Sequence, residues 1–232
     1  MRRLATIVLL VAPVLLAAGL VADHEARNKA TQGLTDAVVE HADGVNVDVN
    51  FEGFPFLTQV WAGRLNDVNV EADSVTTDEI TAHDIRLVAR GVDPSQPHQA
   101  ELLEINATLP TEALDEAIRA RLGPVADAVS LTRRGDGLTL HIDLPGASLQ
   151  LLLGFEMSGD ATIGLAVDDV LLGDVVTLPE PLRDGLAQAL SAVSIDLPQV
   201  PEGLSLTVAR IVDDGLRIRL EGRDVELGEY VN

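Results

Sequence analysis

The sequence predicts an α+β fold in which antiparallel β-structure dominates. Segments that alternate apolar and polar residues recur after residue 44, as in residues 45–51 and 204–212. Such alternation is typical of strands with one buried and one solvated face. Short turn signals such as Asp213-Asp214-Gly215 favour antiparallel hairpins over parallel crossovers. Because strands far outnumber helices, we expect an elongated antiparallel β-sheet rolled around helices.

The beginning of the chain has the features of a targeting element. Arg2 and Arg3 precede an apolar run, residues 4–22, which would span about 28 Å as a helix, enough for a bilayer core. We interpret residues 1–22 as a signal peptide or an N-terminal membrane anchor, since small residues near the end also allow cleavage. The two arginines favour a cytoplasmic N-terminus, which places the remaining chain on the outer side of the plasma membrane.

Residues 23–44 are expected to form a connecting helix. One stripe of this segment carries Ala26, Ala30, Leu34 and Val38 at helical spacing. The stripe predicts that the helix packs on the domain that follows.

The β-rich domain is expected to cover residues 45–232. Two further helices interrupt it: residues 111–123, with Leu114 and Ile118 on one face, and residues 181–193, with Leu186 and Leu190 on one face. This order suggests two units, residues 45–123 and 124–232, each an antiparallel sheet curled over one helix. The expected strands are residues 45–51, 65–72, 75–81, 84–89, 102–108, 129–133, 138–144, 148–155, 161–167, 170–177, 204–212, 216–220 and 225–227.

The charge of the chain argues against some partners. The net charge is −21, and without Arg2 and Arg3 the exported part carries −23, so we expect no nucleic acid as a partner. No basic cluster is evident that could hold a phosphate, only scattered arginines such as Arg64, Arg86 and Arg90. The chain has no cysteine, so apolar burial must hold the fold without disulfides.

Four of the six aromatic residues lie between positions 51 and 61, namely Phe51, Phe54, Phe56 and Trp61. Gly53 and Pro55 break the alternation here, so the segment is expected to connect two strands. One interpretation is an aromatic plug that closes the end of a core. The other, which we expect to hold, is the lip of an apolar cavity or a tip that dips into a membrane, and it requires partly exposed rings at Phe54, Phe56 and Trp61.

The strands of the central region are strongly aliphatic, with Leu149, Leu151, Leu152 and Leu153 followed by Phe155. This composition suits a packed core. It also suits a tunnel for acyl chains, because aliphatic side chains match methylenes and each buried CH₂ contributes about 0.8 kcal/mol.

No motif for catalysis, a cofactor or a metal is evident. The five histidines are isolated, with no second ligand at metal spacing. Adjacent acids such as Asp168-Asp169 would point to opposite faces of a strand, and Asp213-Asp214 marks a turn. We therefore expect a protein that is not an enzyme and has no cofactor.

Three motifs resemble those of the actinobacterial LmeA-like family of phospholipid-binding cell-envelope proteins. They are residues 53–59 (GFPFLTQ) followed by Gly63 and residues 68–70, residues 201–207 (PEGLSLT) and residues 214–218 (DGLRI). The resemblance implies a β-rich fold similar to tubular lipid-binding domains, a place in the cell envelope, and a link to envelope lipoglycan synthesis. Together with the aliphatic strands, it gives as candidate lipid-binding residues Phe51, Phe54, Phe56, Leu57, Trp61, Leu151, Leu153 and Phe155.

Three functions are consistent with these features. The first is a lipid-binding or lipid-shuttling protein whose partners are phospholipid and the plasma membrane, bound through tails more than headgroups. The second is a scaffold that stabilises a membrane enzyme such as an envelope glycosyltransferase, and the third is a hydrolase with dispersed acidic residues.

Overall fold

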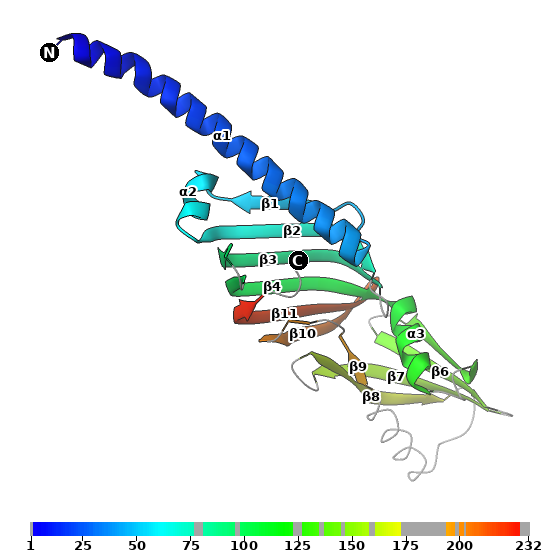
Figure 1. Cartoon of the computed structure of the whole chain (residues 1–232). Coiled ribbons are helices and arrows are strands. Elements are labelled where there is room, and N and C mark those ends of the chain that lie inside the picture. Colours follow the sequence, from blue (N-terminus) through cyan, green and yellow to red (C-terminus); the bar gives the residue numbers. More distant parts are fainter. Residues whose placement is uncertain are drawn as a thin grey trace.

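The computed structural model describes residues 2–76, 81–95, 98–122, 127–134, 137–144, 147–157, 161–172, 194–197, 200–201 and 203–227. In these residues the chain forms two open antiparallel sheets and three helices (Figure 1). The expected α+β class is therefore confirmed. The expected helix at residues 181–193, with its Leu186 and Leu190, lies outside the described residues.

The first sheet has six strands in the order β1-β2-β3-β4-β11-β10. Strand β11 returns to pair with β4, and β10 pairs with β11, so this sheet contains strands from both sides of residue 123. Its strands are β1 (Asp48–Glu52), β2 (Leu65–Thr76), β3 (Thr81–Asp93), β4 (Gln99–Pro110), β10 (Leu204–Val212) and β11 (Gly215–Glu226).

The second sheet has five strands in the order β5-β6-β7-β8-β9. Each strand pairs with its neighbour in sequence, and short connections link β5 to β8, whereas residues 173–193 separate β8 from β9. The strands are β5 (Val129–Arg134), β6 (Gly137–Leu144), β7 (Ala147–Met157), β8 (Thr162–Leu172) and β9 (Ser194–Asp196).

Helix α3 (Thr111–Leu122) joins the two sheets and covers the edge of the second one. Leu114 and Ile118 on its inner face are fully buried, as expected. On the same helix, Asp115 Oδ1 accepts a hydrogen bond from the Leu131 backbone N at 2.7 Å, and Arg119 Nε donates to the Val129 carbonyl oxygen at 2.9 Å. These contacts give β5, an edge strand, partners for backbone groups that would otherwise be unpaired.

Helix α1 (Arg2–Ala42) packs beside β1, and its N-terminal part extends past the sheets (Figure 1). Ala26, Ala30, Leu34 and Val38 contact the hydrophobic core, which confirms the predicted stripe. The expected targeting segment covers residues 4–22. The side chains of α1 are described only from Leu20 onward, so most side chains of this segment lie outside the described part. Among the residues whose side chains are described, no helix has a segment long and apolar enough to span a membrane.

Several expected strands are continuous where the sequence suggested breaks. Residues 65–72 and the beginning of 75–81 form the single strand β2, because Ser74 and Val75 keep their pairing with β3. In the same way, residues 216–220 and 225–226 both belong to β11, and the expected strands at 161–167 and 170–177 share β8 up to Leu172. Polar residues interrupt the alternation at these points and the strands continue through them, in β8 with a shift of register opposite Leu152 and Leu153.

Candidate functional site

One face of the six-stranded sheet is apolar across every strand. We call it the apolar face. A single row of cross-strand neighbours runs from β1 to β10 through Val49, Val70, Leu87, Ile105, Leu220 and Leu206. Since side chains alternate between the two faces of a strand, the register brings these aliphatic residues to one side, and the charged residues between them to the other.

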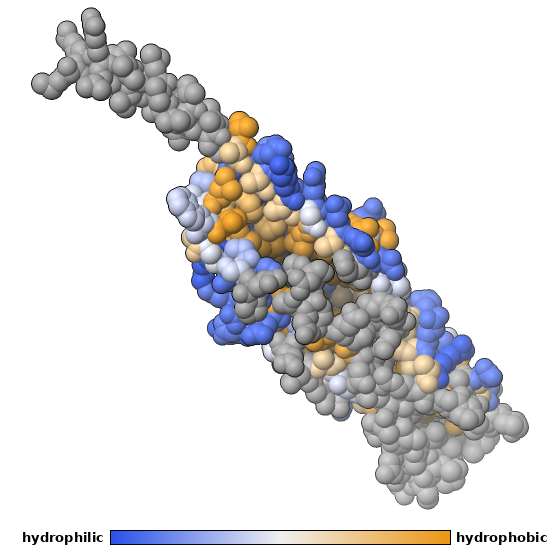
Figure 2. Space-filling model, in the orientation of Figure 1, coloured by the Kyte–Doolittle hydropathy of each residue, from blue (hydrophilic) through white to orange (hydrophobic). Residues whose placement is uncertain are grey.

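The middle of the apolar face is only partly buried. Leu87 on β3 and Ile105 on β4 are direct neighbours on central strands, and both remain partly exposed, as does Ile85. Their neighbours Ala89 and Leu103 are buried. Figure 2 shows apolar side chains gathered between α1 and this sheet, where the surface is hollowed. An elongated apolar molecule could lie on this surface and cover it.

Part of the aromatic segment is buried, as the plug interpretation requires, and part is exposed, as the tip interpretation requires. The rings of Phe51, on β1, and Phe56, the first residue of α2 (Phe56–Trp61), are both buried and meet edge to face, with centroids 5.4 Å apart. Phe56 is only 5% exposed. The expectation that Phe56 belongs to an exposed lip is therefore wrong, because a short helix begins at this residue and turns its ring into the core.

The rest of the segment is exposed. Phe54 is 66% and Trp61 90% exposed, and Leu57 and Val60 on the same short helix are also exposed. Leu20 and Val21 on α1, which packs against α2, are exposed as well. We call Leu20, Val21, Phe54, Leu57, Val60 and Trp61 the apolar tip.

Polar contacts hold α2 against the sheet and against α1. The carboxylate of Asp23, which is buried, accepts a hydrogen bond from the Leu57 backbone N at 2.7 Å and so caps the first turn of α2. The Gln59 amide donates to the Glu52 carbonyl oxygen at 3.2 Å and accepts from the Asn66 backbone N at 2.9 Å. The exposed side chains of α2 are therefore presented by a fixed element.

The other candidate residues lie in the second sheet. Leu151 and Leu153 on β7 are 0% and 1% exposed, and Phe155 is partly buried. The first two therefore offer no exposed surface to an acyl chain in this structure. Their role as lipid contacts stays a prediction, as does that of the other candidate residues.

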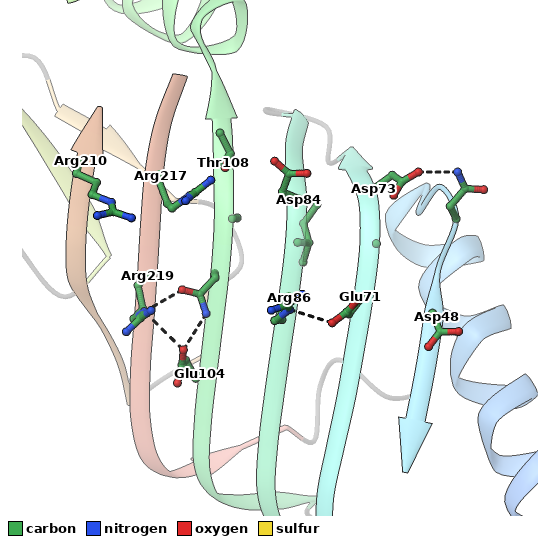
Figure 3. A pocket seen from close by; sticks show the side chains of 15 residues that line it. Asp48, Glu71, Asp73, Asp84, Arg86, Glu104, Thr108, Arg210, Arg217 and Arg219 are labelled. Atoms are coloured by element: carbon green, nitrogen blue, oxygen red, sulfur yellow. Dashed lines mark hydrogen bonds and ion pairs between the residues drawn. The ribbon is translucent and has the colours of Figure 1, made fainter. Parts of the chain in front are cut away.

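The opposite face of the six-stranded sheet, here called the polar face, is covered by charged residues (Figure 3). Arg86 pairs with Glu71 at 2.9 Å and Arg90 with Asp67 at 3.2 Å, while Arg64 pairs with Glu101. The three arginines that looked scattered in the sequence thus each have an acidic partner. The expectation that no basic cluster exists needs one correction, since Arg210, Arg217 and Arg219 line the same side of this face.

No catalytic constellation emerges among the described residues. No group of three or more His, Asp or Glu side chains there could hold a metal ion. His141 shares a hydrogen bond of 2.7 Å with the Thr132 hydroxyl, and Asp213 and Asp214 form the exposed turn between β10 and β11.

Sequence reasoning did not single out Leu87 and Ile105. Both positions fit the expected alternation of buried residues, so no local signal separates them from core residues. The pairing of Arg210 with Arg217 could have been found, because counting outward from the recognised turn at Asp213-Asp214 places them opposite each other.

Comparison with known proteins gives one match. A family model described as LmeA-like phospholipid-binding matches residues 16–221. No curated protein and no solved structure matches the chain.

Proposed function

Because the chain belongs to the LmeA-like phospholipid-binding family, we propose that it holds phospholipid by its acyl chains on the apolar face of the six-stranded sheet, beside α1. The match covers nearly all of this sheet. We further propose that the protein works at the outer side of the plasma membrane and moves lipid to or from the bilayer.

One observation carries the acyl-chain proposal. Leu87 and Ile105 occupy the centre of a six-stranded sheet, where side chains are normally the most deeply buried, yet both remain partly exposed. An acyl chain that covers them removes apolar surface from water on both partners. The binding free energy becomes more favourable by about 0.8 kcal/mol for each CH₂ group that is buried. Their cross-strand neighbours on the apolar face, Val70 and Leu220, are apolar as well, so an acyl chain beside them desolvates no charge there.

The apolar tip supports contact with a bilayer. Trp61 is almost fully exposed on an element that Asp23 and Gln59 hold in place. Amphipathic aromatic rings favour the interface between water and lipid, and exposed aliphatic neighbours add to the affinity. The tip lies where α1 leaves the body towards its apolar N-terminal segment, so both would meet the same membrane.

The alternative function is a scaffold that stabilises a membrane enzyme, such as an envelope glycosyltransferase. The exposed Trp61 favours it, because tryptophan is enriched at the centres of protein interfaces. The partly exposed centre of the apolar face is not explained by this function, and we therefore place lipid binding first.

Native mass spectrometry of the full chain tests the proposal. We expect the purified protein to carry phospholipid that organic extraction removes, and we expect Leu87→Asn to lower this occupancy several-fold. Val88→Asn is the matched control, because Val88 is the next residue of β3, is also partly buried and faces the polar side. A chain free of lipid in every preparation, or equal loss of lipid in both variants, would overturn the proposal.

A further inference from the structure

Three arginines on the polar face, Arg86, Arg90 and Arg219, each have an acidic or amide partner on a neighbouring strand. Along β3, Arg86 lies directly opposite Glu71 and Arg90 directly opposite Asp67, and each pair forms an ion pair. Arg219 on β11 lies opposite Asn106, to which its Nε donates at 2.8 Å, and also lies 3.5 Å from Glu104. Opposite charges on neighbouring strands stabilise a sheet, which explains why arginine occupies these positions.

Arg210 and Arg217 differ from these three arginines. They are direct cross-strand partners on β10 and β11, two positions from the ends of the turn. In the part of the chain that the structure describes, neither guanidinium forms an ion pair or a hydrogen bond. Like charges placed opposite each other destabilise a sheet. Glu156 and Asp168 line a second pocket with Arg210, but among the described residues neither acid forms an ion pair with it. In a chain with a net charge of −21, two neighbouring arginines that no described acid pairs with call for another source of negative charge.

A third unsatisfied group lies beside them. Thr108 on β4 is the cross-strand partner of Arg217 on its other side. Thr108 is 2% exposed, and its hydroxyl has no hydrogen-bond partner among the residues that the structure describes. A buried hydroxyl without a partner destabilises the fold. Thr108, Arg217 and Arg210 all line one pocket of about 580 Å³ (Figure 3).

We propose that Arg210, Arg217 and Thr108 form a binding site for a phosphate group. Guanidinium groups bind phosphate oxygens through two parallel hydrogen bonds, and two of them can share one phosphate. The Thr108 hydroxyl can add a third donor.

The remaining charges of the pocket set the orientation of the ligand. The carboxylates that no arginine neutralises, Asp48, Asp73 and Asp84, lie on β1, β2 and β3, across β4 from the two arginines. Asp73 accepts a hydrogen bond from the Asn46 amide at 2.6 Å. The phosphate therefore belongs over β10 and β11, and hydroxyl or amino groups of the ligand can face the carboxylates.

The site is independent of the proposed acyl-chain surface. Arg210 and Arg217 alternate with Ala209, Leu216 and Ile218, which belong to the apolar side of the same strands. Phosphate binding therefore requires no bound acyl chain, and a soluble phosphate should suffice.

Thermal melts of the full chain in a non-ionic detergent test the site. We compare inorganic phosphate with chloride at equal ionic strength, and expect phosphate to raise the Tm of the wild type in a saturable manner. Arg217→Gln should weaken the apparent affinity by about tenfold or more. Arg86→Gln, in the same pocket but taken from an ion pair, should keep the phosphate effect.

The Thr108→Val variant separates binding from a structural role. Without phosphate its Tm should equal or exceed that of the wild type, because an unpaired buried hydroxyl is removed. With phosphate its gain in Tm should be smaller than that of the wild type. An equal gain would exclude Thr108 from the site.

Two further measurements distinguish the sources of the phosphate group. If the ligand is a lipid headgroup, Arg217→Gln should bind phosphatidylglycerol vesicles less well than Arg86→Gln does, with no such difference on phosphatidylcholine vesicles. If it is a soluble phosphate, glycerol 3-phosphate should saturate the site while both variants bind both kinds of vesicle equally. Equal effects of phosphate and chloride, together with equal vesicle binding by both variants, would overturn the proposal.

Discussion

Both sheets carry leucine and isoleucine on their central strands, but these side chains are buried to different degrees. In the five-stranded sheet, Leu138, Leu140, Leu151 and Ile163 are all fully buried, so that sheet presents a closed core. In the six-stranded sheet, Leu87 and Ile105 hold equivalent central positions and remain partly exposed. Composition therefore does not separate a core from a binding surface. What separates them is whether another element covers the face.

The placement of α1 explains the open face. In the described part of the chain, the helix makes most of its contacts with β1, at the edge of the six-stranded sheet, and with α2. Two of its four contact residues, Ala26 and Ala30, are small. A helix at the edge with short side chains closes that edge, and among the described residues the centre of the face remains partly exposed.

The largest loss of stability is expected at the buried contact between Phe56 and Phe51, at the β1 edge of the six-stranded sheet. Phe56→Ala should lower the free energy of unfolding by about 3–5 kcal/mol, because it removes a buried ring that packs on Phe51. Trp61→Ala should change it by less than about 0.5 kcal/mol, since Trp61 lies at the surface, but should weaken vesicle binding. Chemical denaturation and vesicle flotation measure the two effects. Equal destabilisation by both changes would contradict this division of the aromatic segment.

The next largest loss of stability is expected in the five-stranded sheet, and the matching change in the six-stranded sheet should cost less. Leu151→Ala should cost about 2–5 kcal/mol of stability, as for a large-to-small change in a packed core. In lipid-free protein, Leu87→Ala should cost about 1 kcal/mol or less, because much less apolar surface is buried there. Denaturant titration of both variants after organic extraction provides the test. A cost at Leu87 that matches the cost at Leu151 would mean that the apolar face is packed in solution.

A smaller effect is expected at the contact between α1 and α2. Asp23→Ala removes the carboxylate that caps α2 and should cost about 1 kcal/mol, a typical value for a lost helix cap. It should also raise hydrogen exchange at the Leu57 amide. Unchanged exchange at that amide would show that Asp23 does not hold the tip in solution. Asp36→Ala, an exposed position on the same helix, is a suitable control.

The smallest effect concerns the ion pairs of the polar face. Arg86→Gln should change stability by about 1 kcal/mol or less, because exposed pairs are screened by water and salt. Acyl-chain loading should likewise depend weakly on salt and strongly on chain length. Denaturant titration of this variant tests the first statement, and lipid loading across a salt series tests the second. A steep loss of loading with salt would assign the lipid contact to the charged face instead.

Much of the fold follows from local patterns in the sequence. The alternation of apolar and polar residues predicts nearly every strand, and the helical spacing of Leu114 and Ile118 predicts the buried face of α3. Strand ends were less predictable, because pairing with β3 carries β2 through Ser74. The short strand β9 was missed, since three residues are too few to show a period.

The candidate site was only partly predictable for a physical reason. The sequence shows that Phe56 and Leu87 are apolar, but burial depends on what lies above each side chain. A short helix turns Phe56 inward, whereas in the described part of the chain Leu87 stays partly exposed. Both outcomes depend on contacts between residues far apart in the chain. Local periodicity carries no information on such contacts.

The most direct test of the account maps where a bound phospholipid lies. The full chain is loaded with a phospholipid that carries a photoreactive diazirine in its acyl chain, irradiated and digested, and the labelled residues are identified by mass spectrometry. We expect labels on the apolar side of β3 and β4, at or beside Leu87 and Ile105, and their loss in Leu87→Asn. Labels confined to β7 around Leu151, or to Val88 on the polar face, would contradict the proposal that the open face of the six-stranded sheet binds the lipid.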